Sequence, residues 1–112
     1  MKIAYLEGAL LDYWVAKAQD LRIDGVRNDQ LIVGAAPDLE VFSPSSNWAQ
    51  AGPIIEVQQI DLICDFGRWM ARHGKHEEYS RPSEQPLVAA MRAYLMWEYG
   101  DEVPTTPQPQ CH

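Results

Sequence analysis

The residues best suited to chemistry lie in the polar stretch 72–85, where His73 and His76 stand three positions apart and Glu77 and Glu78 follow. Imidazole and carboxylate groups bind metals and transfer protons, so the spacing permits a metal site or a hydrolase-type enzyme that uses His73 or His76. However, a dedicated metal site needs further ligands on a fixed scaffold, and the stretch shows no helical or hairpin pattern. We therefore interpret it as a solvated polar loop and expect no metal and no cofactor.

Asn47, Trp48 and Gln50 form a second candidate group. An indole beside two amides, which can both donate and accept hydrogen bonds, is typical of a ligand-binding loop. The structural alternative is that Trp48 fills the core while the amides satisfy backbone groups of the loop. Turn chemistry alone explains the surrounding Ser, Pro and Gly residues.

Arg92 is a third candidate, because it lies in an alanine-rich stretch of a helix whose other face is apolar. Its planar guanidinium suits bidentate pairing with a carboxylate or a nucleotide-like anion. Alternatively, its stem covers apolar surface and its charge pairs with Glu98 or Asp12.

Tryptophan is frequent in the chain, at positions 14, 48, 69 and 97, and most of these side chains should be buried. A tryptophan at the surface would mark a protein-recognition patch, because it supplies a large contact area with few rotatable bonds. We assign this role to Trp69 and Trp97, and expect Trp97 to be the exposed one because it lies off the buried stripe of its helix.

Composition limits the classes of function. The chain has 112 residues and a net charge of −7, which disfavours nucleic acid as a partner and is consistent with docking on a basic protein surface. No apolar run is long enough to span a membrane, and the N-terminus does not resemble a secretion signal. Two cysteines favour a reducing compartment, so we expect a cytoplasmic protein in which Cys64 is an inert core thiol. We find no catalytic motif, expect no catalytic residues, and favour a protein that is not an enzyme.

Hydrophobic periodicity predicts helices over 8–19 and 86–99 and short strands over 21–26, 31–34, 39–42 and 60–66, with 53–57 as a further strand. Between them, Ser45 or Ser46 could cap a short helical turn over 45–51 that Gly52 and Pro53 end. The fold class is α+β, with a small antiparallel sheet of about four or five strands and two main helices on one face. We expect one domain over 1–103 and a disordered, Pro-rich tail over 104–112.

The stretch Phe42-Ser-Pro-Ser-Ser-Asn-Trp-Ala-Gln-Ala-Gly-Pro-Ile-Ile-Glu56 resembles the signature of the NinX-type family of small bacteriophage and prophage proteins of unknown function. Two further segments resemble the opening and the closing helix of that family, namely Leu6-x-Gly8-x-x-Leu11-Asp12-Tyr13-x-Val15-Ala16-Lys17-Ala18 and Pro86-Leu-Val-Ala-Ala-Met-Arg-Ala-Tyr94 followed by Gly100-Asp-Glu-Val103. The chain departs from the family pattern at Asn47, Ala51 and Gln85, where the family pattern has Asp, Gly and a Thr helix cap.

The resemblance implies a phage-derived accessory protein without known catalytic residues. Our leading hypothesis is a non-enzymatic module that binds a host or phage protein. The alternative is a domain that binds a small, nucleotide-like anion through the 43–56 signature and Arg92. That alternative requires a pocket that Arg92 and the signature share, whereas a protein-binding module requires an exposed apolar patch near Trp69 or Trp97.

Overall fold

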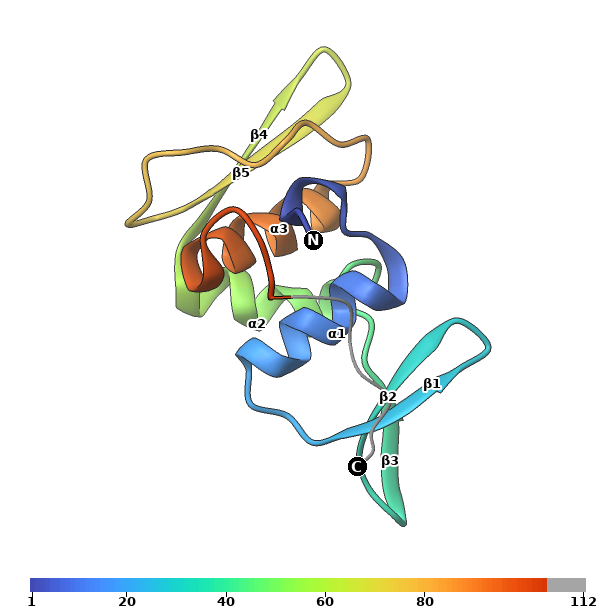
Figure 1. Ribbon diagram of the computed structural model, residues 1–112. Coiled ribbons are helices and arrows are strands. Elements are labelled where there is room, and N and C mark those ends of the chain that lie inside the picture. Colours follow the sequence, from blue (N-terminus) through green and yellow to red (C-terminus); the bar gives the residue numbers. More distant parts are fainter. Residues whose placement is uncertain (105–112) are drawn as a thin grey trace.

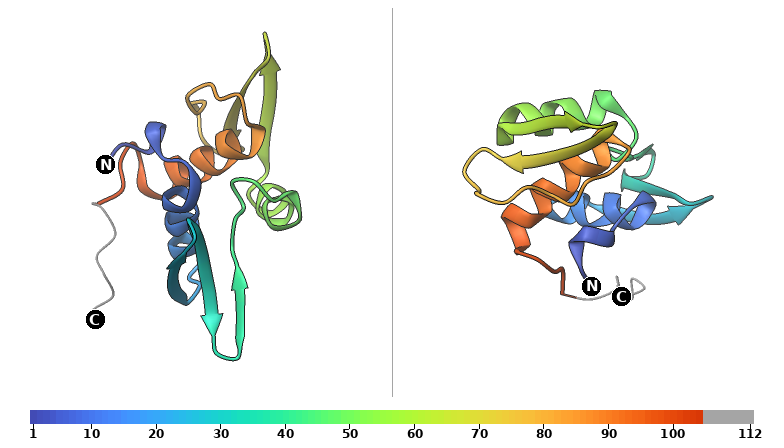
Figure 2. Two further views of the ribbon diagram at one scale, coloured as in Figure 1. Left: turned by 90° about the vertical axis from the view of Figure 1, so that its right-hand side faces the viewer. Right: turned by 90° about the horizontal axis from the view of Figure 1, so that it is seen from above.

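In the computed structural model, which describes residues 1–104, three helices lie between two small antiparallel sheets (Figure 1). The helices are α1 (Gly8–Ala18), α2 (Trp48–Gln58) and α3 (Pro86–Tyr99), and a 3-10 turn, η1 (Ile3–Tyr5), precedes α1. Strands β1 (Ile23–Arg27), β2 (Gln30–Ala35) and β3 (Asp38–Val41) form one sheet in that order, while β4 (Ile60–Asp65) and β5 (Arg68–His73) form a separate hairpin. Figure 2 shows the two sheets at opposite ends of the helical layer.

The α+β class predicted from the sequence is confirmed. The five strands are divided between two sheets, instead of forming the single sheet that we expected. The physical reason is that 53–57 belongs to α2 and not to a strand, so a helix separates β3 from β4. The predicted helices at 8–19 and 86–99 agree with α1 and α3 to within one residue at each end.

Helix α2 corrects our prediction of a short turn over 45–51. Its N-cap is Asn47, whose side chain accepts a hydrogen bond from the Ala49 N–H, and it continues through Pro53 to a left-handed Gln59 at φ 54°. An interior proline costs a helix about 3 kcal/mol because it removes one backbone hydrogen bond. Burial of Ala51 and Ile54 against the core offsets that cost, so packing overrides the local stop signal.

Helix α3 is the centre of the core. Its nine consecutive residues 87–95 are all buried, which requires neighbours on every side of the helix. Helices α1 and α2, turn η1 and the β4–β5 hairpin supply those neighbours. The single buried stripe that the sequence indicated is therefore only part of the surface that α3 buries. The domain prediction of 1–103 ends at Val103, which is 1% exposed, whereas most of the predicted disordered tail lies outside the described residues.

Within residues 1–104, each helix is too short or too polar to cross a lipid bilayer.

Candidate functional site

A cleft of about 410 Å³ lies where the N-terminal ends of α1 and α3 face the loop before α2. A second hollow of about 260 Å³ shares Ser45, Ser46 and Gln85 with it and adds Trp48 at its edge. Since the two hollows share a wall, we treat them as one site and call it the acidic cleft. The residues that line it are Glu7, Gly8, Ala9, Asp12, Asp29, Gln30, Ser43, Ser45, Ser46, Trp48 and 85–88.

Asp12 is the buried carboxylate of the acidic cleft. Its side chain is on the second turn of α1, the residue is 4% exposed, and its Oδ1 accepts a hydrogen bond from the Ser45 N–H at 2.9 Å. Burial raises the pKa of Asp12 to about 6, and the hydrogen bonds from Ser45 oppose the increase. At neutral pH the group is therefore mostly ionised, although it lies in a poorly solvated position.

The charges that line the acidic cleft are predominantly negative. Glu7, Asp12 and Asp29 contribute carboxylates, and none of the described residues that line it is Lys or Arg. Each of the three helix N-termini carries a partial positive charge of roughly half an elementary charge, which favours anions. Glu7 stands at the N-cap position of α1 and offsets one of them. The two other carboxylates, Asp12 and Asp29, exceed the partial positive charges of the two remaining helix N-termini, so the cleft should attract a cation.

Trp48 is the one member of the predicted Asn47, Trp48 and Gln50 group that lines the acidic cleft. Its side chain is 57% exposed, so it does not fill the core. The two amides instead stabilise the loop. Asn47 caps α2, while the Gln50 Oε1 accepts from the Ser43 N–H at 2.6 Å and its Nε2 donates to the Val41 carbonyl at 2.8 Å.

Arg92 lines neither hollow of the acidic cleft. It is 7% exposed, and its Nε donates to the Leu6 carbonyl at 2.9 Å, which ties α3 to the N-terminal segment. Burial lowers the pKa of Arg92, while the neighbouring Glu7 carboxylate raises it. The structure therefore does not bring Arg92 and the signature into one of the described hollows.

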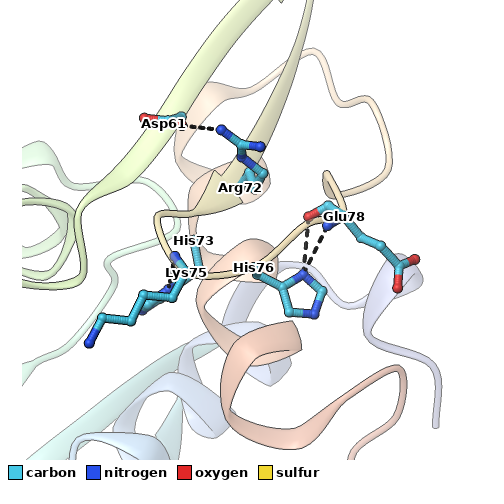
Figure 3. A network of polar contacts seen from close by, with 6 residues as sticks. All are labelled: Asp61, Arg72, His73, Lys75, His76 and Glu78. Atoms are coloured by element: carbon cyan, nitrogen blue, oxygen red, sulfur yellow. Dashed lines mark hydrogen bonds and ion pairs between the residues drawn. The ribbon is translucent and has the colours of Figure 1, made fainter.

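The two histidines of the polar stretch order the loop that follows β5 (Figure 3). The His73 Nδ1 accepts from the Lys75 N–H at 3.1 Å, so its Nε2 carries the proton and donates to the Gln58 Oε1 at 2.9 Å. The His76 Nδ1 accepts from the Glu78 N–H at 3.1 Å. Among residues 1–104, no three His, Cys, Asp or Glu side chains converge closely enough to hold a metal ion.

Of the predicted interaction residues, Trp69 lies on β5 and Trp97 lies on α3. Trp97 is 40% exposed and stacks on the His73 ring, with centroids 4.4 Å apart and planes at 11°, whereas Trp69 is half-buried in β5. Trp97 is exposed, as we expected, but Trp48 is more exposed than either. Cys64 also differs from our expectation, because it is exposed. It lies two residues from the hairpin turn, where β4 has left the core.

A family model described as "Bacteriophage P22, NinX" matches residues 2–98. The chain belongs to this family. Comparison with curated proteins finds no match. The region that matches the NinX model contains all the residues that line the acidic cleft.

The segments that resemble the NinX-type family meet at this cleft. The first supplies Asp12, the second supplies Ser45, Ser46 and Trp48, and the third supplies 86–88. Sequence reasoning missed Asp12 because its spacing places it among the polar residues of α1. The signal that could have identified Asp12 was its place in the segment that resembles the opening of the family. Its partner Ser45 lies 33 residues further along the chain.

Proposed function

We propose that this phage-derived protein is a non-enzymatic accessory protein that acts in the cytoplasm by binding another protein. Its acidic cleft takes a Lys or Arg side chain from a host or phage partner. The observation that carries this proposal is the exposed indole of Trp48 at the edge of a cleft that contains three carboxylates and, among its described lining residues, no basic group.

The chemistry of the cleft favours a basic side chain over a simple cation. An Arg or Lys above the face of a tryptophan gains about 0.5–1 kcal/mol at an exposed site. Carboxylates at the cleft entrance add a modest attraction that salt screens, while a partly buried one such as Asp12 is screened less. Each contribution is small, so a single side chain binds weakly and a partner protein must supply further contacts.

The second candidate function is binding of a small, nucleotide-like anion. The N-termini of α2 and α3 at the cleft favour a phosphate group, and Trp48 could stack on a base. Asp12, Asp29 and Glu7 oppose an anion, and Arg92, which neighbours Glu7 but lines neither hollow, offsets at most that one carboxylate. The two candidates therefore require ligands of opposite charge.

An NMR titration read at the four indole N–H signals separates these functions. The probes are the blocked tripeptide acetyl-Gly-Arg-Gly-amide, its Glu counterpart, and ADP. We expect the Arg peptide to shift Trp48 more than the other three indoles, and the Glu peptide and ADP to leave it unchanged. A Trp48 response to ADP alone would replace the protein-binding proposal with the anion-binding one.

Charge variants provide the matched control. Glu7→Gln with Asp29→Asn removes two carboxylates from the cleft and should weaken binding of the Arg peptide about tenfold. Glu56→Gln with Glu77→Gln removes the same charge from exposed positions that do not line it, and should change the affinity less than twofold. Equal effects of the two pairs would show that only the net charge matters and would contradict a cleft site.

A further inference from the structure

The two sheets have four outer edges, and three of them are obstructed. Strand β1 has an irregular register between Ile23 and Gly25, and such bulges hinder pairing with another strand. The edge of β3 is only four residues long, and the Gln50 amide occupies its Val41 carbonyl. The edge of β5 pairs with residues 80–83. Strand β4 is therefore the one regular, six-residue edge that the described part of the chain leaves uncovered.

The backbone of β4 presents hydrogen-bonding groups at this edge. Trp69 and Ala71 of β5 direct their backbone bonds away from β4, towards Ser83 and Ser80. Their antiparallel partners Cys64 and Leu62 must therefore also point their N–H and C=O groups away from the hairpin. None of the described residues takes up these four groups. An extended strand from another chain can add to a sheet edge at which alternate residues point their backbone N–H and C=O groups outward in this way.

The outer face of the hairpin carries a specific charge pattern beside that edge. Side chains alternate along a strand, so Asp61, Ile63 and Asp65 share one face of β4. The Asp61 carboxylate accepts from Arg72 of β5 at 3.0 Å, which places this face away from α3 (Figure 3). Ile63 is 38% exposed between the two acidic residues. Strand β4 thus presents an acidic, an aliphatic and an acidic side chain in succession beside the open edge, while on the other side Arg72 and Arg68 of β5 lie opposite Asp61 and Asp65.

This pattern opposes pairing between two copies of the chain. Antiparallel pairing of β4 with a second β4 around Ile63 places Asp61 of each copy opposite Asp65 of the other, and like charges directly opposite destabilise a sheet. A strand with basic residues at those two positions, and an aliphatic residue between them, would be complementary.

We propose that β4 accepts an extended strand of another protein, in which Lys or Arg alternates with an aliphatic residue on the face that meets Asp61, Ile63 and Asp65. This interface is separate from the acidic cleft, because no residue of β4 or β5 is among the described residues that line the cleft. Both interfaces select a basic partner.

Amide hydrogen exchange with a synthetic peptide tests the proposal. The probe is the blocked heptapeptide Thr-Lys-Thr-Val-Thr-Lys-Thr, and its control replaces both Lys residues with Glu. At saturating peptide, exchange of the Leu62 and Cys64 amides should slow at least tenfold, while that of Ile63, already bonded to β5, should change little. The Glu peptide should bind at least tenfold more weakly.

Two variants at Cys64 isolate the backbone contribution. Cys64→Pro removes an outward N–H without removing a hydrogen bond of the hairpin. It should weaken binding of the Lys peptide at least tenfold. Cys64→Ser keeps that N–H and should leave the affinity unchanged. If Cys64→Pro unfolds the hairpin, Asp65→Lys replaces it and should abolish the preference for the Lys peptide, because each peptide then meets one opposite and one like charge.

Three results would overturn the proposal. The first is unchanged exchange at Leu62 and Cys64 while the Lys peptide shifts Trp48, which would place the peptide in the acidic cleft alone. The second is equal binding of the Lys and Glu peptides. The third is protection of both amides that rises with protein concentration in the absence of peptide, which would make a second copy the occupant.

Discussion

Asp12 on α1 accepts a hydrogen bond from the backbone N–H of Ser45 at 2.9 Å, although 33 residues separate them in the sequence. This bond joins the first helix to the loop that precedes α2. It satisfies a buried carboxylate at the cleft wall and holds Ser45, which is 5% exposed, beside the start of α3. The position of Trp48 at the edge of the cleft therefore depends on the same loop that Asp12 anchors.

Asp12→Asn should remove a pH dependence of stability. The folded protein holds the pKa of Asp12 at about 6, above its usual value of 3.8, so the native state binds this proton more tightly than the unfolded chain. The stabilisation from the protonated form is present below pH 4 and is lost as the pH rises from 4 to 6, by about 1–3 kcal/mol. Asn cannot ionise but still accepts the Ser45 bond. The free energies of unfolding of the two proteins, measured in urea, should therefore diverge between pH 4 and 6, and parallel curves would refute this role for Asp12.

Gln85→Ser should stabilise the protein. Gln85 stands at the N-cap position of α3 with an extended backbone, but its side chain makes no capping hydrogen bond. A serine there can accept from a free N–H of the first turn and is expected to add about 0.5–1 kcal/mol. Urea denaturation measures the gain. Gln85→Ala serves as the control and should give no increase.

Protonation of His73 should loosen the loop after β5. The His73 Nδ1 accepts from the Lys75 N–H, so a proton on Nδ1 breaks that bond. Burial lowers the pKa of His73 below its usual 6.5, with a smaller contribution from Lys75. The stabilisation is therefore complete above pH 6.5 and is lost as the pH falls through the folded-state pKa.

Hydrogen exchange at the Lys75 amide, followed together with the His73 ring signals, reports this transition. Exchange, corrected for its intrinsic pH dependence, should accelerate as the His73 ring titrates. His73→Phe retains an aromatic partner for Trp97 but lacks both ring nitrogens, so its Lys75 amide should be unprotected at every pH. Constant protection in the wild-type protein while the ring titrates would contradict the mechanism.

Phe66→Asn should stabilise the β4–β5 hairpin. Phe66 and Gly67 form its two-residue turn with φ of 53° and 78°, and the Phe66 side chain is 98% exposed. Asn tolerates a left-handed backbone better than Phe and is favoured before Gly in such turns, so a gain of up to about 1 kcal/mol is expected. Thermal unfolding measures it, and Phe66→Ala provides the comparison. Loss of stability in Phe66→Asn would indicate that the ring makes contacts that the exposed fraction does not reflect.

The sequence predicted the elements whose signals are local. Helices α1 and α3 followed from apolar spacing, and β4 followed from a β-branched, apolar run, whereas β5 was not predicted. It failed for α2, because Gly52 and Pro53 are local stop signals and the compensating burial of Ile54 depends on a distant helix. Because residues 53–57 were predicted as a strand and not as part of α2, the separation of the strands into two sheets was not predicted either.

The candidate site was predicted less well than the fold. Trp48 was identified and lies at the acidic cleft, but Arg92 faces the carbonyl of Leu6 instead. Asp12 was missed because spacing along α1 could not reveal a loop that folds over it from residue 45. Contacts of this kind depend on tertiary packing, which periodicity does not encode.

The most direct test of the central claim is an intermolecular NOE experiment on the labelled protein with the unlabelled peptide acetyl-Gly-Arg-Gly-amide. If the acidic cleft binds a basic side chain, the Arg methylene protons will show NOEs to the ring protons of Trp48. The same NOEs should be much weaker for the Glu7→Gln, Asp29→Asn double variant at equal peptide concentration. NOEs confined to Trp97 or Trp69, or retained at full strength in that variant, would contradict the account.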